Sequence, residues 1–224
     1  MEIYGFSAVV LFLVLFLVWT LYEFQKMKKE LGKVKEKNKE HTSKISELQA
    51  LSTRDELTGL LNVRGGNQIM EHRHSILMRD PCERNNFAMI FFDLNRFKGI
   101  NDKYGHKFGD QVLKFFGEIL TKNLNRGGDV VIRLGGDEFA ALLSECTLDQ
   151  AEAVKEKVKL ALLAEHFEYD GIKLSIRTSV GVATALTENG GVLSLDQLHR
   201  VADKAMYLDK EIEHRDIGDH ERRQ

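Results

Sequence analysis

The chain has 224 residues, which is enough for one domain of average size and an extension. Its 32 basic and 34 acidic side chains give a formal net charge of −2, so no overall positive field argues for binding to nucleic acid. The two cysteines, Cys82 and Cys146, have neither the spacing of metal ligands nor the number that a disulfide framework needs. We expect two inert thiols in a reducing compartment.

An almost unbroken apolar run extends from Ile3 to Tyr22. About 20 apolar residues cross a bilayer as a helix, and aromatic rings such as those of Trp19 and Tyr22 favour the membrane interface. We therefore expect a single-pass transmembrane helix over residues 1–23. A cleaved signal peptide is the alternative, but the run lacks a basic leading segment and a cleavage site of small residues. The lysines that follow the run predict that the C-terminal part lies in the cytoplasm.

Residues 24–52 are polar, contain no proline and have a single glycine. One series of positions, apolar for the most part, recurs there with alternating steps of three and four, as in a heptad repeat. The series is Phe24, Met27, Leu31, Val34, Asn38, His41, Ile45, Leu48 and Ser52. An asparagine at such a core position often specifies a parallel dimer. We expect a parallel coiled coil, with a solvated helix that has no partner as the alternative.

From residue 53 onward, helical and strand patterns alternate. Helical spacing of apolar residues predicts helices over 64–79, 97–104, 110–124, 148–164 and 196–213. In the last helix, the residues expected to face inward are Leu198, Val201, Ala205 and Leu208. Short apolar or alternating runs predict strands over 87–92, 130–132, 139–143 and 172–185. This order indicates an α/β or α+β domain over residues 53–216, with helices covering a mixed central sheet, and a polar tail over 217–224.

Two of these apolar runs flank the sequence Gly135-Gly136-Asp137-Glu138. Apolar runs joined by a glycine pair predict a β-hairpin with a tight turn. The glycines allow a bulky anion to lie against the backbone, and carboxylates beside them are the hard oxygen ligands that Mg²⁺ shares with substrate phosphates. For such a sequence standing alone, an ordinary acidic turn is the favoured explanation. The residues upstream decide between the two interpretations.

Three upstream segments, residues 91–98, 100–106 and 109–110, closely resemble the nucleotide-binding core of the GGDEF family of diguanylate cyclases. Residues 55–60 match the entry motif of that family, and the resemblance extends over residues 55–214. It implies a palm-like nucleotidyl cyclase fold and a bacterial enzyme that condenses two GTP into cyclic di-GMP. It also implies a homodimer, because each 3′-hydroxyl attacks the α-phosphate held by the other domain. With the apolar run, this predicts a location at the bacterial cytoplasmic (inner) membrane.

The resemblance also implies a role for each residue of the site. Asp93, the carbonyl of Leu94 and Asp137 would bind Mg²⁺, with Mn²⁺ as a substitute, and Glu138 would complete the acidic cluster as a further metal-binding residue. Asp137 is in addition a candidate base for the 3′-hydroxyl, so Asp137 and Glu138 are the expected catalytic residues. The expected substrate contacts are Lys98, Asn101, His106, Asp110, Gly135, Gly136 and Lys210.

Asn101 and Asp110 are expected to read the guanine base. Guanine offers N1–H and an exocyclic amine as donors, which a carboxylate accepts, whereas adenine offers a different pattern. These residues therefore favour GTP over ATP and disfavour an adenylate-type cyclase. Taken singly, Asn101 is also consistent with a helix cap, His106 with a surface side chain and Asp110 with an N-cap; their joint spacing argues for the site.

Arg126 and Asp129 lie just before the hairpin, at the spacing that the family uses for inhibition by bound cyclic di-GMP. A solvated charged turn is the alternative. One departure concerns the end of the chain, where Glu213-His214-Arg215 replaces the usual Gly-Arg-Asn, so an arginine that binds phosphate is missing at His214. Two other functions remain open: a receptor that binds cyclic di-GMP at Arg126 and Asp129 without catalysis, and a structural coiled-coil protein with an inactive domain. The intact acidic residues argue against both.

Overall fold

The structure is a computed structural model that describes the backbone of residues 2–221 and the side chains of residues 15–45 and 52–213. The chain divides into two compact units, Met1–Ser52 and Thr53–Gln224.

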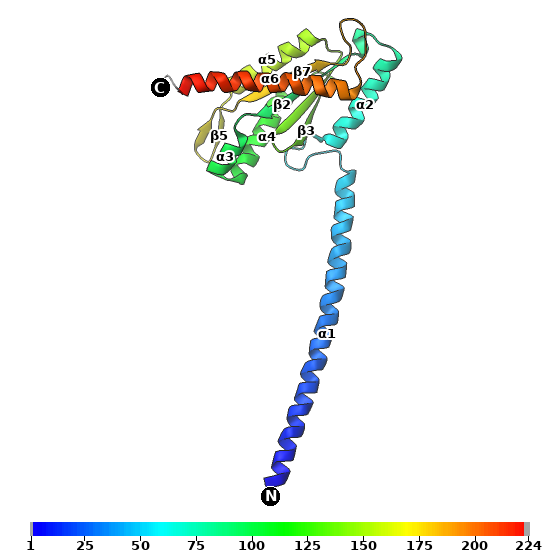
Figure 1. The fold of residues 1–224 in the computed structure, drawn as a ribbon, viewed down its shortest axis with the longest axis vertical. Coiled ribbons are helices and arrows are strands. Elements are labelled where there is room, and N and C mark those ends of the chain that lie inside the picture. Colours follow the sequence, from blue (N-terminus) through cyan, green and yellow to red (C-terminus); the bar gives the residue numbers. More distant parts are fainter. Residues whose placement is uncertain (1, 222–224) are drawn as a thin grey trace. The chain divides into compact units, whose positions relative to one another are not determined.

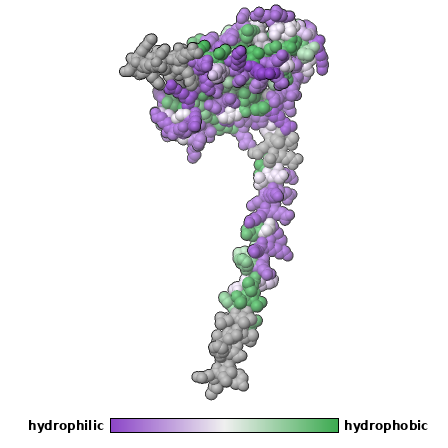
Figure 2. All heavy atoms as spheres, in the orientation of Figure 1, coloured by the Kyte–Doolittle hydropathy of each residue, from purple (hydrophilic) through white to green (hydrophobic). Residues whose placement is uncertain are grey.

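The first unit consists of one helix, α1 (Glu2–Leu51) (Figure 1). Apolar side chains lie among polar ones along it (Figure 2), and the described apolar members of the predicted heptad series are exposed. These are Phe24, Met27, Leu31, Val34 and Ile45. Pairing of this stripe with a partner stays a prediction. Much of the apolar run that begins at Ile3 lies outside the residues with described side chains, and within the described part no helix is long and apolar enough to span a bilayer.

The second unit is built around a five-stranded sheet with the strand order β1-β3-β4-β2-β7. Its strands are β1 (Leu61–Asn62), β2 (Phe87–Leu94), β3 (Val130–Gly135), β4 (Glu138–Ser144) and β7 (Thr178–Thr184). β1 runs parallel to β3 and the other neighbours are antiparallel, so the predicted mixed sheet is confirmed. The predicted strand over 172–185 is two strands, because β6 (Ile172–Leu174) pairs with β5 (Phe167–Tyr169) in a separate hairpin that the sequence did not predict.

Alternate residues of β2 face two apolar cores, as the period of two in a strand requires. The helices of this unit are α2 (Val63–Arg79), α3 (Phe97–Tyr104), α4 (His106–Asn123), α5 (Leu148–Ala164) and α6 (Leu195–Glu221), with a short 3₁₀ turn, η1 (Glu83–Asn85). One core joins Ile90 and Phe92 to α4 and α5, and the other joins Met89 and Phe91 to α2 and α6. All of β2 is buried, which confirms the prediction of a central strand covered on both faces.

Two details of the predicted helices were wrong. α4 begins at His106, four residues before the predicted start, because Gly105 ends α3 and begins α4 at a φ of 85° that glycine adopts without strain. On α6, Val201 and Leu208 are exposed and not inward, while Leu198 and Ala202 are buried. The reason is that α6 lies close to β7 at Gly181, where an added Cβ atom would stand 2.0 Å from the Ala202 carbonyl oxygen, so the side of the helix that carries Ala202 faces the sheet.

Candidate active site

The hairpin between β3 and β4 turns at Gly136 and Asp137, as predicted. Gly135 has a φ of 148° and Gly136 a φ of 54°, in the region that favours glycine. A Cβ atom built on either glycine would meet no atom within 4 Å. Backbone conformation and access to the backbone, rather than packing, therefore explain the glycines.

Two of the three predicted metal-binding carboxylates, those of Asp93 and Asp137, lie close together at the end of β2. Asp93 is 9% exposed and stands opposite Glu138 in the ladder between β2 and β4. The N–H of Leu94 donates to the carbonyl of Asp137 at 3.3 Å, which fixes the hairpin tip against the strand end. Burial, followed by repulsion from the Asp93 carboxylate, raises the pKa of Asp137 above its ordinary value of 3.8. The site is thus electrostatically unfavourable for a second negative charge unless a cation is near.

Lys210 of α6 supplies one such cation. Its Nζ atom lies 2.7 Å from Oδ1 of Asp93, which places one of the predicted substrate-binding residues on one of the predicted metal ligands. The backbone carbonyl of Asp93 accepts a hydrogen bond from the Thr178 hydroxyl at 3.0 Å. Burial of a charged carboxylate is costly without a cationic partner, so Lys210 stabilises the Asp93 carboxylate when neither metal nor substrate is bound.

The donor set fits a divalent cation. Asp93 and Asp137 offer hard oxygen ligands, and the raised pKa of Asp137 marks a place where added positive charge lowers the free energy. Among the described residues, no three acidic, histidine or cysteine side chains are grouped so that they alone could hold a metal. Glu138 is exposed, and its role as a metal ligand stays a prediction. The remaining ligands would be backbone, water or substrate oxygens.

The predicted guanine-binding residues lie where α3 packs on α4. The Oδ1 atom of Asn101 is buried and has no hydrogen-bond partner in the protein. A Cβ atom on Gly109 would stand 1.9 Å from this oxygen, so the glycine leaves room for the asparagine side chain. Asp110, which is partly buried, follows directly in the chain. A buried acceptor without a donor costs about 1–3 kcal/mol, and a ligand with N–H groups would satisfy it.

Lys98 and His106 are exposed on neighbouring elements. Lys98 lies in the first turn of α3 and His106 is the first residue of α4. Both side chains are thus accessible to a ligand, and their contact with substrate stays a prediction. His214, the site of the missing arginine, lies outside the residues with described side chains.

Arg126 and Asp129 share the turn that leads into β3, where the N–H of Asp129 donates to the carbonyl of Arg126 at 3.0 Å. Arg126 is exposed, and the Asp129 carboxylate accepts from the N–H of Ser144 at 3.1 Å. No local pattern indicated a role for Arg73 on α2, whose guanidinium donates to the carbonyls of Gly128 and Leu142. Burial lowers the pKa of Arg73, and Asp129 opposes this shift. Arg73, which lies on another element, therefore stabilises the turn that carries Arg126 and Asp129.

A second contact that local sequence patterns did not reveal joins the entry motif to the glycine turn. Nη1 of Arg133 lies 3.0 and 3.2 Å from the two carboxylate oxygens of Asp55, and Nη2 donates to the carbonyl of Gly136 at 2.8 Å. Asp55 also accepts from the N–H and the hydroxyl of Thr58. Burial raises the pKa of Asp55, but the hydrogen bonds from Thr58 and Arg133 outweigh it, so the pKa is lowered. Arg133 thereby fixes the turn that carries Gly136.

A family model described as "Diguanylate cyclase, GGDEF domain" matches residues 52–215. The chain is 36% identical over 160 residues to the uncharacterized protein YhcK of Bacillus subtilis, covering 70% of this chain and 42% of that protein. It is 32% identical over 167 residues to diguanylate cyclase A of Treponema denticola, covering 74% of this chain and 44% of that protein. The chain thus spans less than half the length of these curated relatives.

Solved structures show the same fold. The isolated GGDEF domain of TpbB (YfiN) from Pseudomonas aeruginosa superposes with a TM-score of 0.63 at 29% identity, covering 70% of this chain and 88% of that chain. The diguanylate cyclase SiaD from the same organism, solved with its activator SiaC, has a TM-score of 0.64 at 24% identity and covers 92% of this chain and 77% of that chain. The predicted palm-like fold is therefore confirmed.

Proposed function

Because the chain belongs to the GGDEF domain family of diguanylate cyclases, we propose that it condenses two GTP into cyclic di-GMP and two pyrophosphates. In each half of the reaction, the 3′-hydroxyl of one GTP attacks the α-phosphate of the other, a P–O bond forms, and pyrophosphate leaves. The observation that carries this proposal is the meeting of Asp93, Asp137 and Lys210 at the end of β2. Two carboxylates and one ammonium group at a glycine turn suit a triphosphate with its cation.

The cation is proposed to be Mg²⁺, with Mn²⁺ as a substitute, held by Asp93, the carbonyl of Leu94 and Asp137. When bound, it would offset the negative charge that develops on the reacting phosphate. With the cation bound to Asp93, the Lys210 ammonium group would be free to bind the phosphate oxygens instead of the Asp93 carboxylate. The backbone at Gly135 and Gly136 offers open space for the phosphates.

The substrate is proposed to be GTP rather than ATP because of the side chains that lie where α3 packs on α4. The buried Oδ1 of Asn101 lacks a donor in the protein, and guanine supplies N–H donors on the edge that it would present to Asn101 and Asp110. Adenine lacks the N1–H donor. An acceptor left unpaired is the usual reason why a site rejects an analogue.

Two copies of the domain are required, since each site holds a single GTP. The exposed apolar stripe of α1 supports a parallel coiled coil that raises the effective concentration of one domain near the other. The apolar run before it supports attachment to the bacterial inner membrane, with the domain in the cytoplasm. Both are proposals from the sequence.

The alternative is a receptor that binds cyclic di-GMP at Arg126 and Asp129 with little catalysis. The exposed guanidinium of Arg126 supports binding of a ligand at this turn, but a receptor has no need of Asp93 and Asp137. We therefore propose that this turn serves feedback inhibition of an active enzyme.

Incubating the purified 224-residue chain with GTP and Mg²⁺, followed by mass spectrometry of the products, tests the proposal. We expect cyclic di-GMP from the wild type and none from Asp137→Ala. A folded chain that gives no product, but binds added cyclic di-GMP, would support the receptor.

A further inference from the structure

The side chains with which α6 faces the rest of the domain change from apolar to charged along the helix. Its first half faces the sheet with apolar residues such as Leu198 and Ala202, and Met206 is the last of its side chains to pack against either apolar core in the described part. The next inward-facing side chains are carboxylates: Asp209 and Glu213 have 14% and 22% of their side-chain area exposed, while Leu208 is half exposed. The last described turns of α6 are therefore held by polar contacts.

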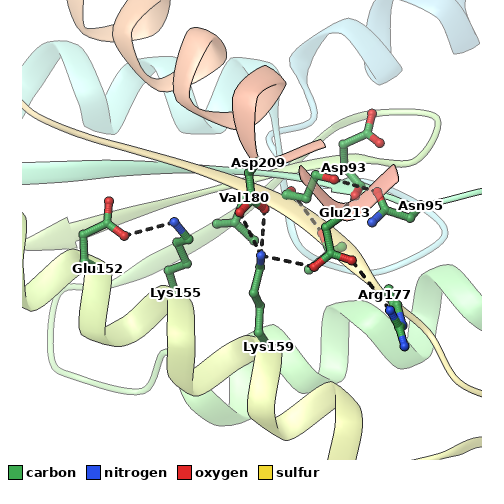
Figure 3. A network of polar contacts seen from close by, with 11 residues as sticks. Asp93, Asn95, Glu152, Lys155, Lys159, Arg177, Val180, Asp209 and Glu213 are labelled. Carbon is green, nitrogen blue, oxygen red and sulfur yellow. Dashed lines mark hydrogen bonds and ion pairs between the residues drawn. The ribbon is translucent and has the colours of Figure 1, made fainter. Parts of the chain in front are cut away.

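Asp209 binds two elements at once, as Figure 3 shows. One of its oxygens accepts from the backbone N–H of Val180 at 2.8 Å, and both accept from Nζ of Lys159 at 2.9 and 2.8 Å. Val180 lies on β7, an edge strand of the sheet that pairs only with β2. Lys159 lies on α5, whose buried residues pack on the face of the sheet opposite to α6. The pair thus joins the two helical layers around the open edge of β7.

Two longer ion pairs lie next to the pair of Asp209 with Lys159. Nζ of Lys159 also lies 3.4 Å from Glu213, and Glu213 is 3.9 Å from Arg177 (Figure 3). Two carboxylates and two basic groups balance, so this cluster has no excess charge with which to bind a substrate anion. Its contacts indicate a structural purpose for α6.

Lys210 is the next residue after Asp209 and projects about 100° further round the helix. Its Nζ lies 2.7 Å from Asp93, yet its side chain is 40% exposed, much more than that of Asp209. A lysine side chain has four flexible carbons. Its flexibility alone does not direct the ammonium group to Asp93. The direction of the Lys210 side chain therefore depends on how firmly α6 is held in place.

We propose that Asp209, bound by Lys159 and the edge of β7, is a positioning residue that directs Lys210 to the carboxylate and phosphate site. The inference rests on the proposed function, because it assigns Lys210 to the triphosphate. Asp209 acts through Lys210 alone and touches no substrate atom.

The test measures binding of 3′-deoxy-GTP with Mg²⁺ to the 224-residue chain by calorimetry, since this nucleotide lacks the hydroxyl that reacts. Asp209→Asn keeps an oxygen for Val180 but removes the charge that binds Lys159. We expect its Kd to rise about ten-fold, the usual scale for residues that orient a binding group. Lys159→Met is expected to match it, and the double variant to equal either single one.

The decisive comparison is made in a Lys210→Met background. There, Asp209→Asn is expected to change the Kd no further, whereas a general loosening of the domain would weaken binding in both backgrounds. Lys155→Met is the matched control, because Lys155 is on the same helix and its ion pair with Glu152 does not reach α6 (Figure 3). Circular dichroism verifies folding, and Lys159→Met replaces Asp209→Asn if the latter does not fold.

The outcomes separate the two proposals. An unchanged Kd in both Asp209→Asn and Lys159→Met, with weakened binding in Lys210→Met, would overturn the positioning role and leave the proposed function intact. Unchanged binding in Lys210→Met would instead contradict the phosphate site on which the proposed function depends. An equal further loss from Asp209→Asn in the Lys210→Met background would also overturn the positioning role.

Discussion

The ion pair of Arg133 with Asp55 offers a quantitative test of how the glycine turn is held. Arg133→Met removes the bonds to Asp55 and to the Gly136 carbonyl, while Asp55→Asn keeps an acceptor for Thr58 and removes only the charge. The side chains of Arg133 and Asp55 are 12% and 23% exposed, so water replaces the lost partners only in part.

The expected magnitudes follow from these contacts. A hydrogen bond to a charged group contributes about 1.5–3 kcal/mol; partial exposure reduces the coupling between the two residues to about 1–2 kcal/mol. Arg133→Met is expected to cost about 3 kcal/mol in all, since it also leaves Asp55 without its cation. The exposed pair of Lys122 with Glu165 is the control, with an expected coupling below about 1 kcal/mol.

A double-mutant cycle from urea unfolding, followed by far-ultraviolet circular dichroism, measures the coupling. The single tryptophan, Trp19, lies on α1, so its fluorescence does not follow the domain. Because the pKa of Asp55 is lowered, its stabilisation is present above the ordinary value of 3.8 and is lost as the pH falls through the folded pKa. A coupling no larger than that of the control pair, or one unchanged in acid, would refute this account.

Three further predictions concern the site and its support. The pKa of Asp137 is raised, so its favourable contribution to the free energy of unfolding is present below the ordinary value of 3.8 and is lost as the pH rises through the folded pKa. Asp137→Asn should therefore stabilise the domain at neutral pH, by less than about 1 kcal/mol. Thermal unfolding near pH 3 should show no such gain, and a gain there would contradict the argument. Gly181→Ala should cost about 3 kcal/mol in urea unfolding, because its Cβ would lie 2.0 Å from the Ala202 carbonyl oxygen and 2.3 Å from the Met206 nitrogen; an unchanged midpoint would show that α6 moves away easily. Arg126→Ala should relieve inhibition by added cyclic di-GMP at least ten-fold in the product assay, and unaltered inhibition would contradict feedback at this turn.

Local patterns were sufficient for most of the fold. The continuous apolar run of β2 and the glycine pair of the hairpin are signals within a few residues, and both elements formed as predicted. The spacing of α6 was ambiguous, since Val201 and Ala202 are both apolar. The choice between them depends on Gly181, which lies on another element and whose missing side chain lets α6 approach.

The ion pairs that hold the site in place could not be predicted from local patterns, for the same reason. Arg133 and Asp55 are 78 residues apart, and Lys159 and Asp209 are 50 apart. Nothing near either residue in the chain indicates its partner, because only the folded sheet brings them together. The candidate site residues could therefore be proposed from the sequence, whereas the residues that hold them in place could not.

The absence of a side chain at Gly109 has a consequence for the placement of Asn101. Any side chain at Gly109 would collide with the Asn101 amide, while Gly109 itself needs no unusual backbone angle. A Cβ atom at position 109 would therefore require the Asn101 side chain to turn away from its present place. The residue at position 109 thus controls the orientation of the side chain that is proposed to read the base, although it need not touch the base itself.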